Sequence, residues 1–194
     1  PPSFFARASS VVRKKMDDKT FAFFVDRSDF QVGKVNIGFE TCKNGGMACG
    51  AVQMDLSDFQ FNQWHHLAWT HSHLDGKMSD YSFYIDGIPT LVGRGSSEPD
   101  YFTSEGILTV GEGYFNGAID ELRISDEVIY KGQFRAPQRL RPKKSTLALW
   151  HFDEPMNSAH YHDASGRSNT LFNSKFSVQP LGQLIFSWGN LKRL

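Results

Sequence analysis

The sequence predicts an all-β fold in which two layers of strands form a β-sandwich. Short runs rich in aromatic and β-branched residues follow one another along the 194 residues, and Gly, Pro, Asn and Asp separate them. Apolar residues at helical spacing are almost lacking, so we expect little helix. Such runs bury their apolar sides by stacking one sheet on another.

The strand pattern is clear in seven segments. We expect strands within residues 19–28, 34–41, 63–72, 81–93, 106–113, 146–154 and 182–189. In the third, alternation places Trp64 and His66 on one face and His65 and Leu67 on the other. Asp86-Gly87 divides the fourth into a hairpin, because Asp-Gly between β-rich runs is typical of a two-residue turn.

The stretch from residue 116 to residue 144 is less regular. Ile119 and Leu122 are three positions apart and cannot share a face of a regular strand, so we expect a bulge near Asp120-Glu121. Residues 126–134 are the best candidate for a short helical turn. Residues 135–144 contain two prolines and five basic residues, which indicates a surface connection.

Charge and hydropathy exclude several classes of partner. The chain has 21 Lys and Arg and 21 Asp and Glu, so its net charge of zero gives no reason to expect nucleic acid or an anionic membrane surface as partner. No apolar run is long enough to span a bilayer. The first residues, PPSFFARASS, include neither an initiator Met nor the apolar part of a signal peptide. We therefore expect a processed end, or a part of a larger polypeptide or assembly.

The chain has two cysteines, Cys42 and Cys49, which flank a Gly-rich turn. Two cysteines that face each other across a hairpin can form a disulfide, which suits an oxidising compartment. We favour the disulfide, and two free thiols in a loop are the alternative.

Three blocks in a fixed order carry a family resemblance. They are FNQWHHLAWTHS, YSFYIDGIP and LTVGEGYFNGAIDELRIS. This order, a Trp-His strand, a strand that ends in Asp-Gly and a Gly-rich strand that leads into Ile-Asp-Glu-apolar-Arg-Ile, resembles the laminin G-like, concanavalin A-like jelly-roll family over about residues 20–130. The resemblance implies a two-layer antiparallel jelly roll. We expect its core to include Phe23, Trp64, Leu67, Phe83, Ile85, Val110, Leu122, Ile124, Leu149 and Phe152.

The resemblance also raises a question of domain organisation. Family members usually begin with a strand like LALWHFDE and a loop like DASGRSN, whereas here both follow the most diagnostic block. Residues 145–194 either begin a second, truncated jelly roll or complete the first one. Fifty residues are too few for a second sandwich of this type. We therefore favour a single domain over residues 1–194, completed by residues 145–194.

Calcium is the metal that the sequence favours. Calcium binds carboxylate, amide and carbonyl oxygens, and the loop DASGRSN offers Asp163 and Asn169. Family members often carry a structural calcium ion near the corresponding positions, and a bulged Asp120 would approach the loop if strand 146–154 pairs beside it. The alternative is that Asp163 makes an Asx-turn and Asp120 meets an arginine.

The sequence gives little support for catalysis. Related glycosidases use paired carboxylates on one strand, but Asp120-Glu121 and Asp126-Glu127 lack the alternating spacing that places two carboxylates on one face. There is no Ser nucleophile elbow and no Gly-rich phosphate loop. We therefore expect that the chain is not an enzyme.

The remaining function classes are non-catalytic. We expect an extracellular or cell-surface module that binds a glycan or a protein, with Tyr114 and Phe115 as candidates to stack on sugar rings. Ordinary packing is the other interpretation of these two aromatic residues. A structural subunit of a larger surface or appendage complex is the alternative function, and a glycoside hydrolase is less favoured.

Overall fold

The computed structural model describes residues 10–16, 19–27, 34–43, 46–55, 59–60, 63–73, 78–96, 107–112 and 117–173. These residues contain strands and turns, and no helix lies among them. The strands are β1 (Ser10–Met16), β2 (Lys19–Arg27), β3 (Lys34–Lys43), β4 (Gly46–Asp55), β5 (Leu67–His73), β6 (Met78–Ile85), β7 (Ile88–Ser96), β8 (Ile107–Glu112), β9 (Leu122–Ser125), β10 (Thr146–Trp150), β11 (His160–Tyr161) and β12 (Leu171–Phe172).

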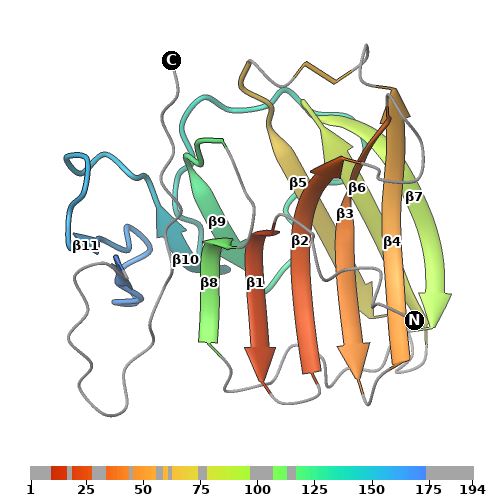
Figure 1. Cartoon of the computed structure of the whole chain (residues 1–194), viewed down its shortest axis with the longest axis horizontal. Helices are drawn as coiled ribbons and strands as arrows, with labels where there is room; N and C mark the ends of the chain where they lie inside the picture. Colours follow the sequence, from red (N-terminus) through yellow and green to blue (C-terminus); the bar gives the residue numbers. More distant parts are fainter. Residues whose placement is uncertain are drawn as a thin grey trace.

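Two antiparallel sheets form the two main layers. One sheet has the order β4-β3-β2-β1-β8, and the other has the order β5-β6-β7. Figure 1 shows the five-stranded sheet in front of the three-stranded sheet. The strands and their layering agree with the predicted antiparallel sandwich.

A buried apolar cluster lies between the two layers. Ile37 of the five-stranded sheet and Phe83 of the three-stranded sheet are fully buried in it. The rings of Phe23 and Phe83 stack with centroids 5.5 Å apart. The other members, buried or partly buried, are Phe59, Leu67, Trp69, Ile85 and Leu91. The alternation of apolar residues in β5 and β6 thus turns one face of this sheet toward the other sheet.

A second apolar cluster is built around β10. β10 pairs antiparallel with β9, so that Trp150 lies opposite Leu122. Ala148 and Trp150 pack in this cluster with Val110 of β8. Its other members are Leu108, Ile119, Ile124, Phe152, Tyr161, Leu171 and Phe172. The chain after residue 145 therefore shares a core with β8 and β9.

This pairing is the arrangement that a completed sandwich requires. That residues 1–194 form a single domain stays a prediction. The strand expected within residues 182–189 lies outside the described residues.

Eight of the ten expected core residues can be placed in these clusters as buried or partly buried members, and Leu149 is fully buried as well. Trp64 is the exception, because 68% of its surface is exposed. It precedes β5, which begins at Leu67 rather than at residue 63. Leu67 and Trp69 have the opposite parity and pack toward the core, so Trp64 falls on the outer side.

Two further local predictions were wrong. Residues 126–134 form bends rather than a helical turn, and Gly132 in this segment has φ of 70°. The backbone irregularity before β9 is a left-handed residue, Glu121 with φ of 54°, and the register shift in the β9–β10 pair lies between Thr146 and Ala148. The predicted surface connection over residues 135–144 is correct, apart from Leu140, which is buried.

The predicted Asp86-Gly87 hairpin joins β6 to β7. Both turn residues have positive φ, 53° and 82°, as a type I′ turn requires. The Asp86 carboxylate accepts the backbone N–H of His66 and lies 2.8 Å from Nδ1 of His65. Gly87 has no space for a side chain, because a Cβ there would lie 2.0 Å from the carbonyl oxygen of Phe134. Two of the sequence blocks thus meet at this turn and stabilise the fold.

Candidate functional site

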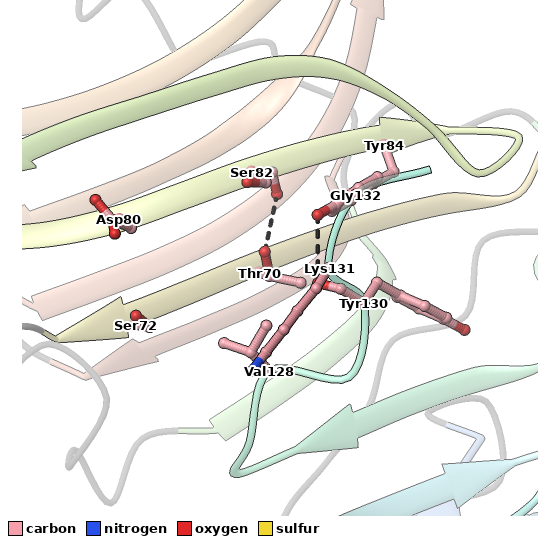
Figure 2. Close-up of a pocket in the computed structure, with 9 residues that line it drawn as sticks. All are labelled: Thr70, Ser72, Asp80, Ser82, Tyr84, Val128, Tyr130, Lys131 and Gly132. Carbon is pink, nitrogen blue, oxygen red and sulfur yellow. Dashed lines mark hydrogen bonds between the residues drawn. The ribbon is translucent and has the colours of Figure 1, made fainter. Parts of the chain in front are cut away.

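A depression of about 400 Å³ lies on the outer face of the three-stranded sheet. Its floor comes from the register of β5 and β6, in which Thr70 lies opposite Ser82 and Ser72 lies opposite Asp80. Directly opposed residues of an antiparallel pair point to the same side of the sheet. Four polar side chains are therefore gathered on one small area, as Figure 2 shows.

The segment after β9 forms the wall of this depression. Val128, Tyr130, Lys131 and Gly132 line it from that side. The buried Tyr84 attaches the wall to the sheet, because its hydroxyl donates to the carbonyl of Tyr130 at 3.3 Å. The rings of Tyr130 and Phe134 stack at 3.7 Å, and the backbone N–H of Phe134 donates to Gly87. The depression is therefore pre-formed by contacts of the protein itself.

The charged groups of the depression have different partners. Arg94 of β7 donates to the Asp80 carboxylate at 2.7 and 3.3 Å. This hydrogen bond lowers the pKa of Asp80 against the smaller effect of desolvation, so the group stays ionised as an acceptor at neutral pH. Lys131 is exposed, and in Figure 2 its side chain runs along the edge of the depression toward Val128.

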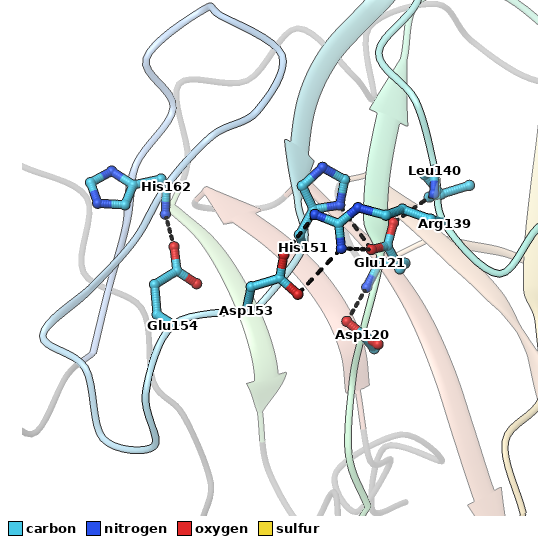
Figure 3. Close-up of polar contacts among 8 residues, drawn as sticks. All are labelled: Asp120, Glu121, Arg139, Leu140, His151, Asp153, Glu154 and His162. Carbon is cyan, nitrogen blue, oxygen red and sulfur yellow. Dashed lines mark hydrogen bonds and ion pairs between the residues drawn. The ribbon is translucent and has the colours of Figure 1, made fainter.

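A second polar cluster lies where β9 begins and β10 ends (Figure 3). Oε1 of Glu121 lies 2.8 Å from Nδ1 of His151, and Arg139 donates to the same oxygen at 3.3 Å. Oε2 of Glu121 accepts the backbone N–H of Leu140 at 2.6 Å. Arg139 also donates to Asp153 at 2.6 Å. Glu121 thus ties the connection of residues 135–144 to both strands.

The carboxylates of this cluster accept hydrogen bonds from other groups of the protein. Both Glu121 oxygens are engaged by internal donors, and the neighbouring Asp120 accepts the backbone N–H of Glu121 at 2.9 Å. Desolvation raises the pKa of Asp120, and the nearby carboxylates of Glu121 and Asp153 add to this effect. The backbone hydrogen bond and Arg139 oppose it. These contacts fit a structural role for the Ile-Asp-Glu motif.

The loop after β11 closes around the carboxylate of Asp163. Its Oδ1 accepts the backbone N–H groups of Leu149 and Ser165, and its Oδ2 accepts the Ser165 hydroxyl and the Asn169 N–H. Burial raises the pKa of Asp163, but these four hydrogen bonds outweigh it and hold the pKa below its ordinary value. The Asn169 side-chain amide donates to the carbonyl of Leu147 at 2.8 Å.

The structure brings two of the three predicted calcium ligands together. Asp163 and Asn169 share a hydrogen bond, and a β-bridge joins Asp163 to Trp150. Asp120 precedes β9, which pairs with Trp150 through Leu122. A strand has its two neighbours on opposite edges, so β10 lies between Asp120 and Asp163.

As arranged, these residues do not fit a calcium ion. The four acceptor positions of the Asp163 carboxylate are already used by protein donors. Among the described residues, no group of three or more His, Cys, Asp or Glu is placed to hold a metal ion. A calcium ion in this loop would have to displace these donors, and the experiment that tests the site expected from the sequence is given below.

Other predicted site residues are placed only in part. Tyr114 and Phe115 lie outside the described residues. The backbones of β3 and β4 pair as the predicted hairpin, with Cys42 opposite Met47 and Cys49 opposite Glu40. The two cysteines are therefore diagonal rather than directly opposite, and the disulfide stays a prediction.

Sequence analysis missed the depression. The signal was present, because Thr70 and Ser72 of one strand and Asp80 and Ser82 of the next are polar at alternate positions. The sequence alone did not show that Thr70 lies opposite Ser82 and Ser72 opposite Asp80. It also did not show that residues 128–132 pass beside these four residues.

Comparison with known proteins gives the family. A family model of the laminin G type, described as the concanavalin A-like lectin/glucanases superfamily, matches residues 4–133. The chain belongs to this superfamily. No curated protein and no solved structure matches it. Laminin G-like domains are generally non-enzymatic and typically extracellular or surface-associated, although some concanavalin A-like members are glycosidases.

The depression of this concanavalin A-like chain lies within the matched region, since its lining runs from Thr70 to Gly132. β10 and the Asp163 loop lie beyond it. Membership supports a non-catalytic binding module in general. None of the described segments forms a helix that could cross a membrane.

Proposed function

We propose that the chain is a non-catalytic, extracellular or surface-exposed module that binds a glycan on the outer face of β5, β6 and β7. The observation that carries this proposal is the pre-formed depression floored by Thr70, Ser72, Asp80 and Ser82. Hydroxyl and carboxylate groups exchange hydrogen bonds with sugar hydroxyls, and a site fixed in advance loses little entropy on binding.

A protein ligand is the second candidate. Val92 lies opposite Ser82 in the β6–β7 pair and is 69% exposed. Its apolar side chain lies on the same side of the sheet as the depression and gives a partner protein a surface to contact. In this case the chain would be a structural part of a larger surface assembly.

Two experiments distinguish a glycan ligand from a protein ligand: a glycan array, and the same array with a variant whose depression is filled by a larger side chain. The variant Ser72→Tyr places a large side chain on the floor, and the matched control Thr90→Tyr adds the same bulk to an exposed position of β7 that does not line the depression. Glycan signals that Ser72→Tyr abolishes and Thr90→Tyr retains support the proposal. An array without signals for the folded wild type contradicts it and favours the protein ligand.

A further inference from the structure

The size of the depression and the charges that line it indicate which kind of glycan it binds. Its volume of about 400 Å³ is near the lower end of the range of about 300–1,000 Å³ for ligand sites, which suits one or two sugar units rather than a long chain. The rest of a longer glycan would lie outside it. Recognition is then concentrated on one or two residues of the glycan.

The charges select among such sugar residues. The negative charge of Asp80 is already balanced by Arg94, which donates two hydrogen bonds to it. Among the described lining residues, Lys131 is the further charged group, and it is exposed at the edge. A ligand with one anionic group therefore gains an attraction that a neutral one lacks.

The lining presents apolar and polar surface in similar amounts. Val128 and Tyr130 of the wall contribute apolar groups, while the floor is formed by hydroxyl groups and a carboxylate. A flat pyranose ring has hydroxyls around its edge and C–H groups on its faces, and both kinds of surface find a counterpart here. A simple inorganic anion would leave the floor unused.

We infer that the depression binds an acidic sugar, a pyranose that carries one carboxylate. Its hydroxyls contact Thr70, Ser72, Ser82 and Asp80, and its carboxylate contacts Lys131. This assignment rests on the proposed function, because it names the ligand class of the same site. Lys131, which lies outside the sheet, then determines the preference for an acidic over a neutral sugar. The floor residues contribute affinity for both kinds of sugar.

The test compares three probes by titration calorimetry at low salt: the methyl glycoside of glucuronic acid, the methyl glycoside of glucose, and acetate. We expect the uronic acid to bind roughly tenfold more tightly than the glucoside, and acetate to bind more weakly still. Lys131→Ala should reduce the uronic acid to the affinity of the glucoside. Lys131→Arg, which retains the charge, should keep most of the preference. Ser72→Tyr should abolish binding of both sugars.

Other results of these titrations would overturn either the acidic ligand, the sugar ligand or the proposed function as a whole. Equal affinity for both sugars, unchanged in Lys131→Ala, overturns the acidic ligand and leaves the proposed glycan site standing. Acetate that binds as tightly as the uronic acid overturns a sugar in favour of a simple anion. Absence of binding by all sugars, together with an empty array, overturns the proposed function itself. Lys131 is exposed, so its variants are expected to fold, and a thermal melt of each verifies this.

Discussion

The carboxylate of Asp163 accepts a hydrogen bond from the backbone N–H of Leu149 at 2.9 Å, which joins the 163–169 loop to β10. Three further donors of the loop complete its contacts. Asp163→Asn replaces half of these acceptor positions by an NH₂ group that faces other donors. We expect the free energy of unfolding to fall by about 1–3 kcal/mol in urea denaturation at neutral pH.

The stabilisation by the Asp163 carboxylate should decrease at acidic pH. The pKa of Asp163 is lower in the folded chain, so its contribution is fully present above the ordinary value of 3.8 and is lost as pH falls through the folded pKa. Wild type and Asp163→Asn should therefore converge in stability at low pH. The exposed Asp126→Asn is the control, and an equal loss in that variant would contradict the assignment.

The same loop tests the calcium prediction. A bound ion raises the melting temperature with the logarithm of free calcium over its dissociation constant. Because Asp163 is bonded to internal donors, we expect the melt to be the same in calcium and in chelator. A midpoint that rises with calcium, and does so less in Asp163→Asn, would instead support the calcium site expected from the sequence.

We expect His66 to make the stability of the chain depend on pH. Its ring lies edge-on to Tyr130 and Phe134, and its Nδ1 is buried without a hydrogen-bond partner. Burial lowers its pKa, and Arg123 adds to this effect against the opposing carboxylate of Asp86. The unfolded chain therefore binds a proton at a higher pH than the folded chain does. Stability should decrease as pH falls below the ordinary value of 6.5, until the folded pKa is reached.

The variant His66→Phe removes this titration. We expect it to flatten the stability profile between neutral pH and the folded pKa of His66, as measured by urea denaturation at several pH values. His162→Phe, at an exposed position, should keep the wild-type slope. If both variants have the wild-type slope, His66 is not the group responsible.

Glu121 and Arg139 should differ in their importance. Glu121 accepts the Leu140 N–H and contacts His151 with a side chain that is only 14% exposed, whereas the Arg139 side chain is 56% exposed. Glu121→Ala leaves these donors unpaired, and we expect a loss of about 1–3 kcal/mol or more. Arg139→Ala should cost less than about 1 kcal/mol, because solvent screens its ion pairs. Urea denaturation measures the free energy of unfolding of both variants. A larger loss in Arg139→Ala than in Glu121→Ala would contradict this prediction.

Removal of residues 145–194 tests the single domain. The truncation deletes Trp150, which is fully buried, and with it Ala148, Tyr161 and Leu171 of the apolar cluster that contains Val110. We expect residues 1–144 to aggregate or to melt far below the full chain. The milder variant Trp150→Ala should cost about 3–5 kcal/mol. A truncated chain as stable as the full chain would show that residues 145–194 begin a separate unit.

The disulfide between Cys42 and Cys49 is tested by intact mass after alkylation. The prediction is that both thiols become alkylated only after reduction. The paired backbones place the two cysteines two residue pairs apart, so the bond would need a change in the pairing of β3 and β4. Alkylation of both thiols without prior reduction would show that they are free.

The sequence by itself determined most of the longer strands and one of the turns between them, although β1 and β4 lay outside the segments predicted as strands. Period-two alternation is a local property, so it predicted the buried faces of β5 and β6 through Leu67, Phe83 and Ile85. The Asp86-Gly87 hairpin was equally predictable, since few residue pairs adopt two successive left-handed conformations at low cost.

Only the tertiary structure decided what the polar residues do. Asp163 and Asp120 have compatible chemistry for one ion, yet β10 separates them, and each carboxylate already accepts hydrogen bonds from the protein. The depression depends on the register of two strands and on the path of a third segment. Local periodicity indicates which face of a strand a residue takes, but which residues lie opposite each other and which segment passes beside them depend on contacts between residues far apart in the chain.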